Sequence, residues 1–261
     1  MDQRQAKLQA QGWFAHQEAM TLAYRGRLKE AARLSESAIL LARQAGLRER
    51  PAQFAGARAV WSALFGLREE AQSEATAALS IYRGRDADYG PAFALELLHD
   101  SAQAQMIEAE LERRYPEDTS VQFSYLPALR GLEALNKGDA AKALKMTQAA
   151  APYDLAVPGT AFWSGASFFG ALYPVYVRGL AYSRLGRHRD AGAEFQKIVD
   201  HPGITLNDPI GPMARLQLAR ALSASGDRVQ SAAAYRDLLA IWKNADPDLP
   251  VVQEAKAEAP D

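Results

Sequence analysis

Histidine can act as a general acid, a general base or a metal ligand, but the spacing of the four histidines in this sequence does not predict a shared catalytic or metal site. They are His16, His99, His188 and His201. No two of them stand where two imidazoles would face one metal ion. Asp246 and Asp248 begin like a calcium-binding loop, but the glycine and the distal glutamate of such a loop do not follow. Without a general base near a nucleophile, we expect no enzyme, no catalytic residue, no metal site and no cofactor.

Aromatic side chains gather in residues 151–171, APYDLAVPGTAFWSGASFFGA, where the available chemistry is binding. They include Phe162, Trp163, Phe168 and Phe169. No charged residue lies between Leu155 and Val177, but prolines, glycines and hydroxyl groups interrupt the run. We therefore expect no membrane span. Two interpretations remain: a long loop and lengthened helix packed on their neighbours, or the aromatic wall of a small-ligand pocket.

The elements that would position such residues repeat along the chain. In five places a glycine is followed five residues later by alanine or serine, and a small residue stands seven residues before it. These glycines are Gly26, Gly66, Gly138, Gly186 and Gly226. Such a glycine ends a helix in the left-handed conformation, and the small residues let two helices approach closely. With 52 alanines in the chain, the pattern predicts a series of helical hairpins. Asn207-Asp208-Pro209 predicts a helix start, with a capping carboxylate followed by proline.

The stretch Gly179-Leu180-Ala181-Tyr182, with Gly186, Ala191 and Phe195, resembles the tetratricopeptide repeat. A weaker unit has His99 where the turn glycine would stand. The resemblance implies an all-α, right-handed superhelical stack of about six helix-turn-helix hairpins within residues 1–245. The units would lie near residues 12–45, 52–85, 85–118, 124–157, 172–205 and 212–245, with the aromatic insertion at 151–171. Residues 246–261 would form an acidic tail or a capping helix.

In tetratricopeptide-like stacks the first helices line a concave groove, so the resemblance also implies where a partner would bind. The groove positions are Trp13, His16, Met20, Tyr24, Tyr89, Phe93, Tyr125, Tyr173 and Tyr176. Aromatic rings with one polar end suit a partly wet contact surface, the alternative being that each ring packs between repeats. The Lys and Asn pattern with which some family members grip a peptide's carboxylate is absent.

A narrower resemblance concerns stretches such as YLPALRGLEALNKGDAAKAL and WKNADPDLP. They are similar to the C-terminal helical region of large bacterial proteins that carry a serine/threonine kinase or a winged-helix DNA-binding domain at the other end. The sequence has no Gly-rich phosphate loop, no kinase triplets and no basic recognition helix. The resemblance therefore implies neither activity for this chain.

The charge balance also limits the possible partners. Thirty Lys and Arg residues stand against 31 Asp and Glu residues, so the net charge of -1 gives no reason to expect nucleic acid. Because the chain has no cysteine and no apolar signal at its start, we expect a cytoplasmic protein. The favoured function is a non-catalytic scaffold that binds a protein or peptide in its concave groove. The alternative is a small-ligand sensor domain of a larger bacterial signalling protein. The sequence leaves the oligomeric state open.

Overall fold

The computed structural model describes residues 3–156 and 172–260, and these residues form six helical hairpins. The paired helices are α1 (Gln3–Tyr24) with α2 (Leu28–Gln44), α3 (Arg50–Leu64) with α4 (Arg68–Ile81), α5 (Arg85–Leu97) with α6 (Ser101–Arg114), η1 and α7 (Val121–Tyr125 and Leu126–Asn136) with α8 (Ala140–Gln148), α10 (Tyr173–Arg184) with α11 (His188–Val199), and α13 (Ile210–Ala224) with α14 (Arg228–Ile241). Three short helices are η2 (Ala151–Tyr153), α12 (Pro202–Thr205) and α15 (Pro250–Glu258). These residues contain no β-strand. The prediction of an all-α stack of hairpins is confirmed.

Each hairpin turns at a residue in the left-handed backbone conformation. The φ angles are 72° at Gly26, 84° at Gly66, 79° at Gly138, 69° at Gly186 and 89° at Gly226. His99 adopts the same conformation, with φ at 61°, in the one hairpin whose turn lacks glycine. A side chain in this region costs roughly 1–2 kcal/mol, which the surrounding hairpin offsets.

Small residues within the first helices let the second helices approach closely. A Cβ added at Gly179 would lie 2.6 Å from the ring of Phe195. At Gly131 it would lie 2.8 Å from side-chain atoms of both Thr147 and Val177. Both distances are shorter than any ordinary contact. The small positions in the repeat pattern therefore mark helix crossings, as the sequence predicted.

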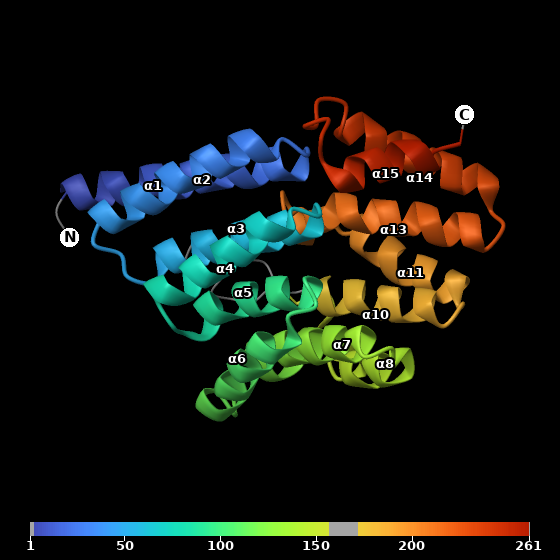
Figure 1. Ribbon diagram of the computed structural model, residues 1–261, viewed down its shortest axis with the longest axis horizontal. Coiled ribbons are helices and arrows are strands. Elements are labelled where there is room, and N and C mark those ends of the chain that lie inside the picture. The colour runs from blue at the N-terminus through green and yellow to red at the C-terminus, as the bar shows by residue number, and fades with distance from the viewer. Residues whose placement is uncertain (1–2, 157–171, 261) are drawn as a thin grey trace.

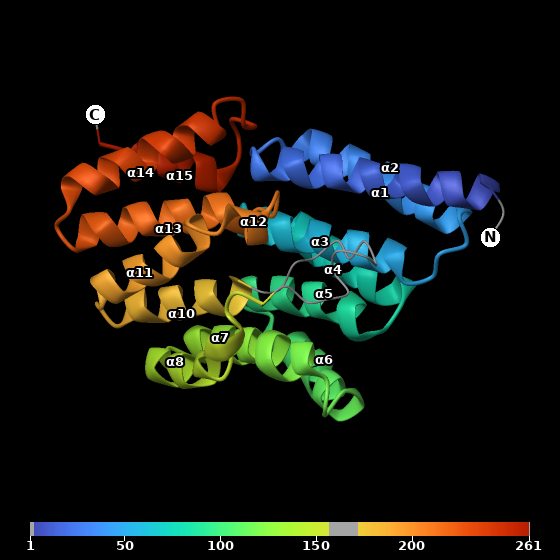
Figure 2. The same ribbon diagram turned by 180° about the vertical axis from the view of Figure 1, so that it is seen from behind.

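The stack of hairpins follows a path that returns on itself. In Figure 1, helices α1 to α5 descend on the left, α6 to α8 lie at the bottom, and α10 to α15 rise on the right. Figure 2 shows the same arrangement from behind. The largest cluster of buried apolar residues extends from Ala19 in the first hairpin to Ala255 in the last helix. Within residues 3–156 and 172–260, no helix is both long enough and apolar enough to cross a bilayer.

The first and last hairpins meet at a contact that we call the seam, formed by Tyr24, Gly26 and Lys29 with Trp242 and Asp246. The Asp246 backbone N–H donates to the Gly26 carbonyl oxygen at 2.9 Å. The Trp242 indole N–H donates to the Tyr24 carbonyl oxygen at 3.1 Å. The Lys29 backbone N–H donates to Asp246 Oδ2 at 2.9 Å. The seam joins the two ends of the stack, so the inner face of the first helices is not an open groove.

A second set of contacts joins α1 to the start of α13. The Asn207 side-chain amide donates to the Gln17 carbonyl oxygen at 2.8 Å and to Thr21 Oγ1 at 3.1 Å. Gly211 lies against Tyr24, and a Cβ there would be 2.9 Å from the tyrosine ring. The absence of a side chain at Gly211 therefore leaves room for the Tyr24 ring between the two helices.

Candidate binding site

The first helices converge on the interior of the closed stack, and most of the groove positions are buried there. Seven of the nine are at most 4% exposed: His16, Met20, Tyr89, Phe93, Tyr125, Tyr173 and Tyr176. Trp13 and Tyr24 are half-buried. Their convergence agrees with the sequence analysis, but these seven side chains do not present an exposed surface in this structure. The reason is that these side chains pack between neighbouring hairpins, as the contacts of Tyr89 with Tyr125 and of Phe93 with Tyr173 show.

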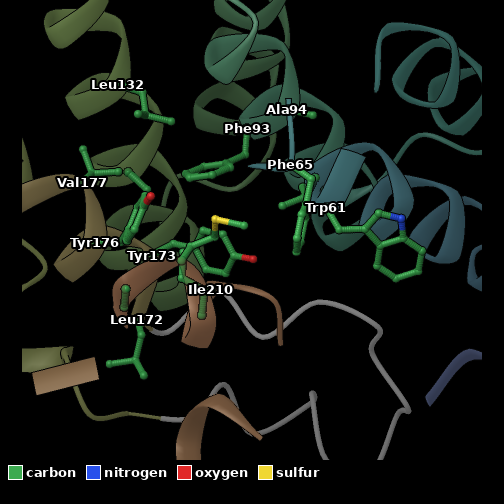
Figure 3. Close-up of a cluster of buried hydrophobic side chains, with 14 of the residues drawn as sticks. Trp61, Phe65, Phe93, Ala94, Leu132, Leu172, Tyr173, Tyr176, Val177 and Ile210 are labelled. Carbon is green, nitrogen blue, oxygen red and sulfur yellow. The ribbon is translucent and has the colours of Figure 1, made fainter. Parts of the chain in front are cut away.

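Aromatic rings from successive hairpins contact one another across this interior. The rings of Tyr89 and Tyr125 are stacked, with centroids 4.0 Å apart and planes 7° apart. Phe93 meets Tyr173 edge to face at 4.8 Å. Figure 3 shows Phe93, Tyr173 and Tyr176 converging from α5 and α10. Edge-to-face and offset stacked pairs add about 0.5–1.5 kcal/mol each beyond area burial, so these rings stabilise the closed stack.

Asp208 places a carboxylate among these rings. Its Oδ1 accepts hydrogen bonds from the Tyr173 hydroxyl at 2.9 Å and from the Ile210 backbone N–H at 2.9 Å. Its Oδ2 is buried and has no hydrogen-bond partner among the described residues. Burial raises the pKa of Asp208 to about 7, although both hydrogen bonds lower it. The charge of Asp208 also helps burial to raise the pKa of Tyr89, which places the two side chains in one electrostatic environment.

A second tyrosine–aspartate pair lies nearby and has every polar group satisfied. The Tyr125 hydroxyl donates to Asp86 Oδ1 at 2.8 Å. Arg85 holds the same carboxylate with two hydrogen bonds of 2.8 and 2.9 Å, and it also donates to Asp118 at 2.7 Å. This pair is a structural ion network. Asp208, by contrast, forms no ion pair with any described residue.

His16 belongs to the core of the first two hairpins. Its ring stacks on Phe54 at 4.1 Å and lies 5.9 Å from the ring of Trp61. Its Nδ1 lies 3.4 Å from the Ser35 hydroxyl oxygen. The Trp61 indole N–H is buried with no hydrogen-bond acceptor among the described residues. His16 therefore contributes to packing between hairpins rather than to an exposed contact surface.

Sequence analysis missed Asp208 and Trp61 as members of the inner face. It interpreted Asp208 as a helix-capping residue, and the hydrogen bond from Ile210 N–H to its Oδ1 agrees with a local role of this kind. The signal that could have found the second role is that Asp208 is the only Asp, Glu, Lys or Arg residue between Asp200 and Arg215. Phe162, Trp163, Phe168 and Phe169, the predicted wall of a small-ligand pocket, lie outside the described residues. Within residues 3–156 and 172–260, no group of three His, Cys, Asp or Glu side chains is placed to hold a metal ion.

Comparison with known proteins finds similarity among solved structures. No protein-family model and no curated protein matches the sequence. The chain is similar to the crystal structure of yeast Tom70, with 14% sequence identity and a TM-score of 0.48. The match covers 88% of this chain and 48% of that one, so the chain spans about half the length of that structure.

Proposed function

We propose that this chain is a non-catalytic interaction module that binds an extended segment of a partner protein along the inner face of its first helices. Stacked helical hairpins commonly build continuous binding surfaces from successive repeats. Here Tyr89, Phe93, Tyr125 and Tyr173 come from three successive hairpins and contact one another. Tyrosine and tryptophan side chains on such a surface supply large contact areas with a polar end, which favours them as anchors for a partner.

The observation that carries this proposal is the unsatisfied Oδ2 of Asp208. Leaving a buried polar group without a partner costs about 1–3 kcal/mol, and more for a charged group. Asp88 and Asp154 also have one buried oxygen without a partner, but the other oxygen of each pairs with a cation, whereas Asp208 forms no ion pair with any described residue. A backbone N–H or an ammonium group of a partner segment would supply the missing donor.

Access to this face requires the seam to open. The seam combines hydrogen bonds with the buried indole of Trp242, but far fewer contacts join the first hairpin to the last than join the two helices of either hairpin. Regions with few buried apolar contacts open locally at a lower free energy than the rest of a protein. We therefore infer that the first hairpin separates from the last while each hairpin stays folded, and that the partner binds the opened form.

The same carboxylate also favours the second candidate function, a small-ligand sensor. A small molecule with one donor group would satisfy Asp208 Oδ2 as well as a peptide N–H would. Mass spectrometry of the protein under non-denaturing conditions, after purification from its own cells, separates the two functions. A retained small molecule supports the sensor, and binding of extended peptides supports the interaction module.

Peptide binding tests the proposal. Peptides would be selected from a displayed random library, and their dissociation constants measured by fluorescence anisotropy for three proteins: wild type, Asp208→Asn and Asp237→Asn. Asp237 is an exposed acid on α14 and serves as the matched control. We expect Asp208→Asn to bind at least about tenfold more weakly, which corresponds to 1.4 kcal/mol, and the control to bind like wild type. Equal affinities for all three proteins would contradict the assignment of Asp208 to the binding face.

A further inference from the structure

A pocket of about 360 Å³ lies beside the seam, between the end of α1 and the end of α14. Its lining residues are Tyr24, Arg25, Arg27, Ala240, Ile241, Lys243 and Asn244. Residues 24–27 belong to the first hairpin and residues 240–244 to the last, so only the closed stack assembles this pocket. We call it the seam pocket.

The lining of the seam pocket contains three cations and no carboxylate. Arg27 forms an ion pair with Glu30 at 2.6 Å, just outside the pocket. Arg25 and Lys243 are exposed and form no ion pair with any described residue. Like charges that share a pocket without a counter-charge repel one another, and an anion between them would remove that repulsion.

The acids closest in sequence to Lys243 are already engaged elsewhere. Asp246 accepts the Lys29 backbone N–H, and Asp248 pairs with the Lys29 ammonium group at 2.8 Å. Both acids therefore bind Lys29 of the first hairpin, and the positive charge of Arg25 and Lys243 remains unbalanced.

Two other described pockets lack this excess of charge. A pocket of about 430 Å³ is lined by Arg48, Arg50 and Arg85, but also by Glu49 and Asp86. Another, of about 360 Å³ between α11, α13 and α14, has Asp227 in its lining. Among these three pockets, the seam pocket alone has a lining that is cationic without any acid.

The end of α1 does not account for Arg25 and Arg27. Cations are favourable near a helix C-terminus because they interact with free carbonyl groups. At the end of α1, however, the Tyr24 carbonyl oxygen accepts from Trp242, and the Leu22 carbonyl oxygen accepts from the backbone N–H of Arg27.

We propose that the seam pocket binds an anionic ligand, carrying phosphate or carboxylate groups, between Arg25 and Arg27 of the first hairpin and Lys243 of the last. Arginine suits both groups because its guanidinium can donate two parallel hydrogen bonds. Because only the closed stack forms the pocket, the ligand stabilises closure by RT ln(1 + L/Kd), where L is the free ligand concentration. If a partner binds the opened form, as the proposed function states, the ligand opposes partner binding. The binding of the ligand to the seam pocket does not depend on the proposed function.

Titration calorimetry tests the binding step, with pyrophosphate as the phosphate probe and citrate as the carboxylate probe, at about 0.15 M salt to screen diffuse attraction. The site variant is Arg25→Gln with Lys243→Gln. The matched control is Arg113→Gln with Lys145→Gln, two exposed cations without ion pairs on α6 and α8. Circular dichroism should show both variants as helical as wild type, since neither removes an internal ion pair.

We expect saturable binding to wild type and control, and at least about tenfold weaker binding to the site variant. Binding of pyrophosphate alone would assign a phosphate ligand, and binding of citrate alone a carboxylate ligand. Absence of saturable binding with both probes would overturn the proposal. Equal weakening in the site variant and the control would also overturn it, because diffuse charge would then account for the binding. The experiment uses no partner peptide, so its failure would leave the proposed function untouched.

Discussion

Two tyrosine–aspartate pairs lie on the inner face of this stack, and they differ in what surrounds the carboxylate. Tyr125 donates to Asp86, which Arg85 holds with two further hydrogen bonds. Tyr173 donates to Asp208, whose second oxygen is buried without a partner. The first pair needs nothing more to be stable. The second is stable only because the rest of the fold offsets its cost, and groups of this kind are typical of functional sites.

The difference between Asp86 and Asp208 should have its largest effect on how the stability of the protein depends on pH. Burial raises the pKa of Asp208 to about 7 from its ordinary value of 3.8, so the folded state binds a proton that the unfolded state releases. The stability due to this group is present at low pH and is lost as pH rises from about 4 to about 7. Between pH 5 and pH 8 the loss should be about 2–3 kcal/mol.

Urea denaturation at the two pH values measures this loss. Other buried acids such as Glu96 also have raised pKa values, so the informative quantity is the difference between wild type and Asp208→Asn. Between pH 5 and pH 8, the free energy of unfolding should fall by about 2–3 kcal/mol less in the variant than in wild type. The same pH dependence in both proteins would show that Asp208 is solvated in the folded state.

Amide substitution at the two aspartates should separate the pairs at a single pH. At pH 6, Asp86→Asn should destabilise the protein by about 2 kcal/mol, because Arg85 loses a charged acceptor. Asp208→Asn should cost less than about 1 kcal/mol, since an amide keeps the oxygen that accepts from Tyr173 and Ile210. Chemical denaturation of the two variants measures both values. The reverse order would mean that Asp208 is the structural acid and Asp86 the dispensable one.

Weakening the seam should expose the second pair and leave the hairpins folded. Asp246→Ala removes the acceptor of the Lys29 backbone N–H and should lower stability by about 1 kcal/mol. Hydrogen exchange should become faster in the first turn of α13, near Asp208, and stay unchanged in the hairpin of α10 and α11. Asp237→Ala, an exposed acid outside the seam, is the control. Uniformly faster exchange would indicate global destabilisation rather than opening of the seam.

The smallest effect is expected from a control substitution outside both tyrosine–aspartate pairs. His99 has φ at 61°, and His99→Gly should raise stability by about 0.5–1 kcal/mol, since relief of backbone strain exceeds the entropy that glycine loses. Thermal denaturation measures the change. The substitution His99→Gly should leave the pH dependence of stability that we assign to Asp208 unaltered. A lower melting temperature would show that the imidazole makes contacts worth more than the strain.

The hairpins were predictable from sequence because their determinants are local. A left-handed turn favours glycine wherever it occurs, as at Gly186, and a helix crossing requires a small residue such as Gly179. Even His99, which breaks the glycine pattern, occupies the predicted turn and has the same backbone conformation. The expectation that the first helices share one face came from the resemblance to the tetratricopeptide repeat.

The seam and the second pair were not predictable, because both depend on residues far apart in the chain. Lys29 and Asp246 are 217 positions apart and meet only after small rotations accumulate over six hairpins. Asp208 has a local signal as a helix-capping residue, but its burial depends on Tyr173, 35 positions away. No repeat pattern records such contacts, so the sequence left open which groove positions bind a partner and which pack between repeats.

The central claim is that Asp208 recognises a partner, and the pKa of its carboxyl group tests this most directly. Carbon-13 NMR of the labelled carboxyl groups, assigned with Asp208→Asn, would follow this pKa in the free protein and with a saturating selected peptide. We predict a pKa near 7 in the free protein. It should fall clearly in the complex, because a donor to the ionised carboxylate favours the charged form. A carboxyl group whose pKa stays the same while the peptide binds would contradict the claim.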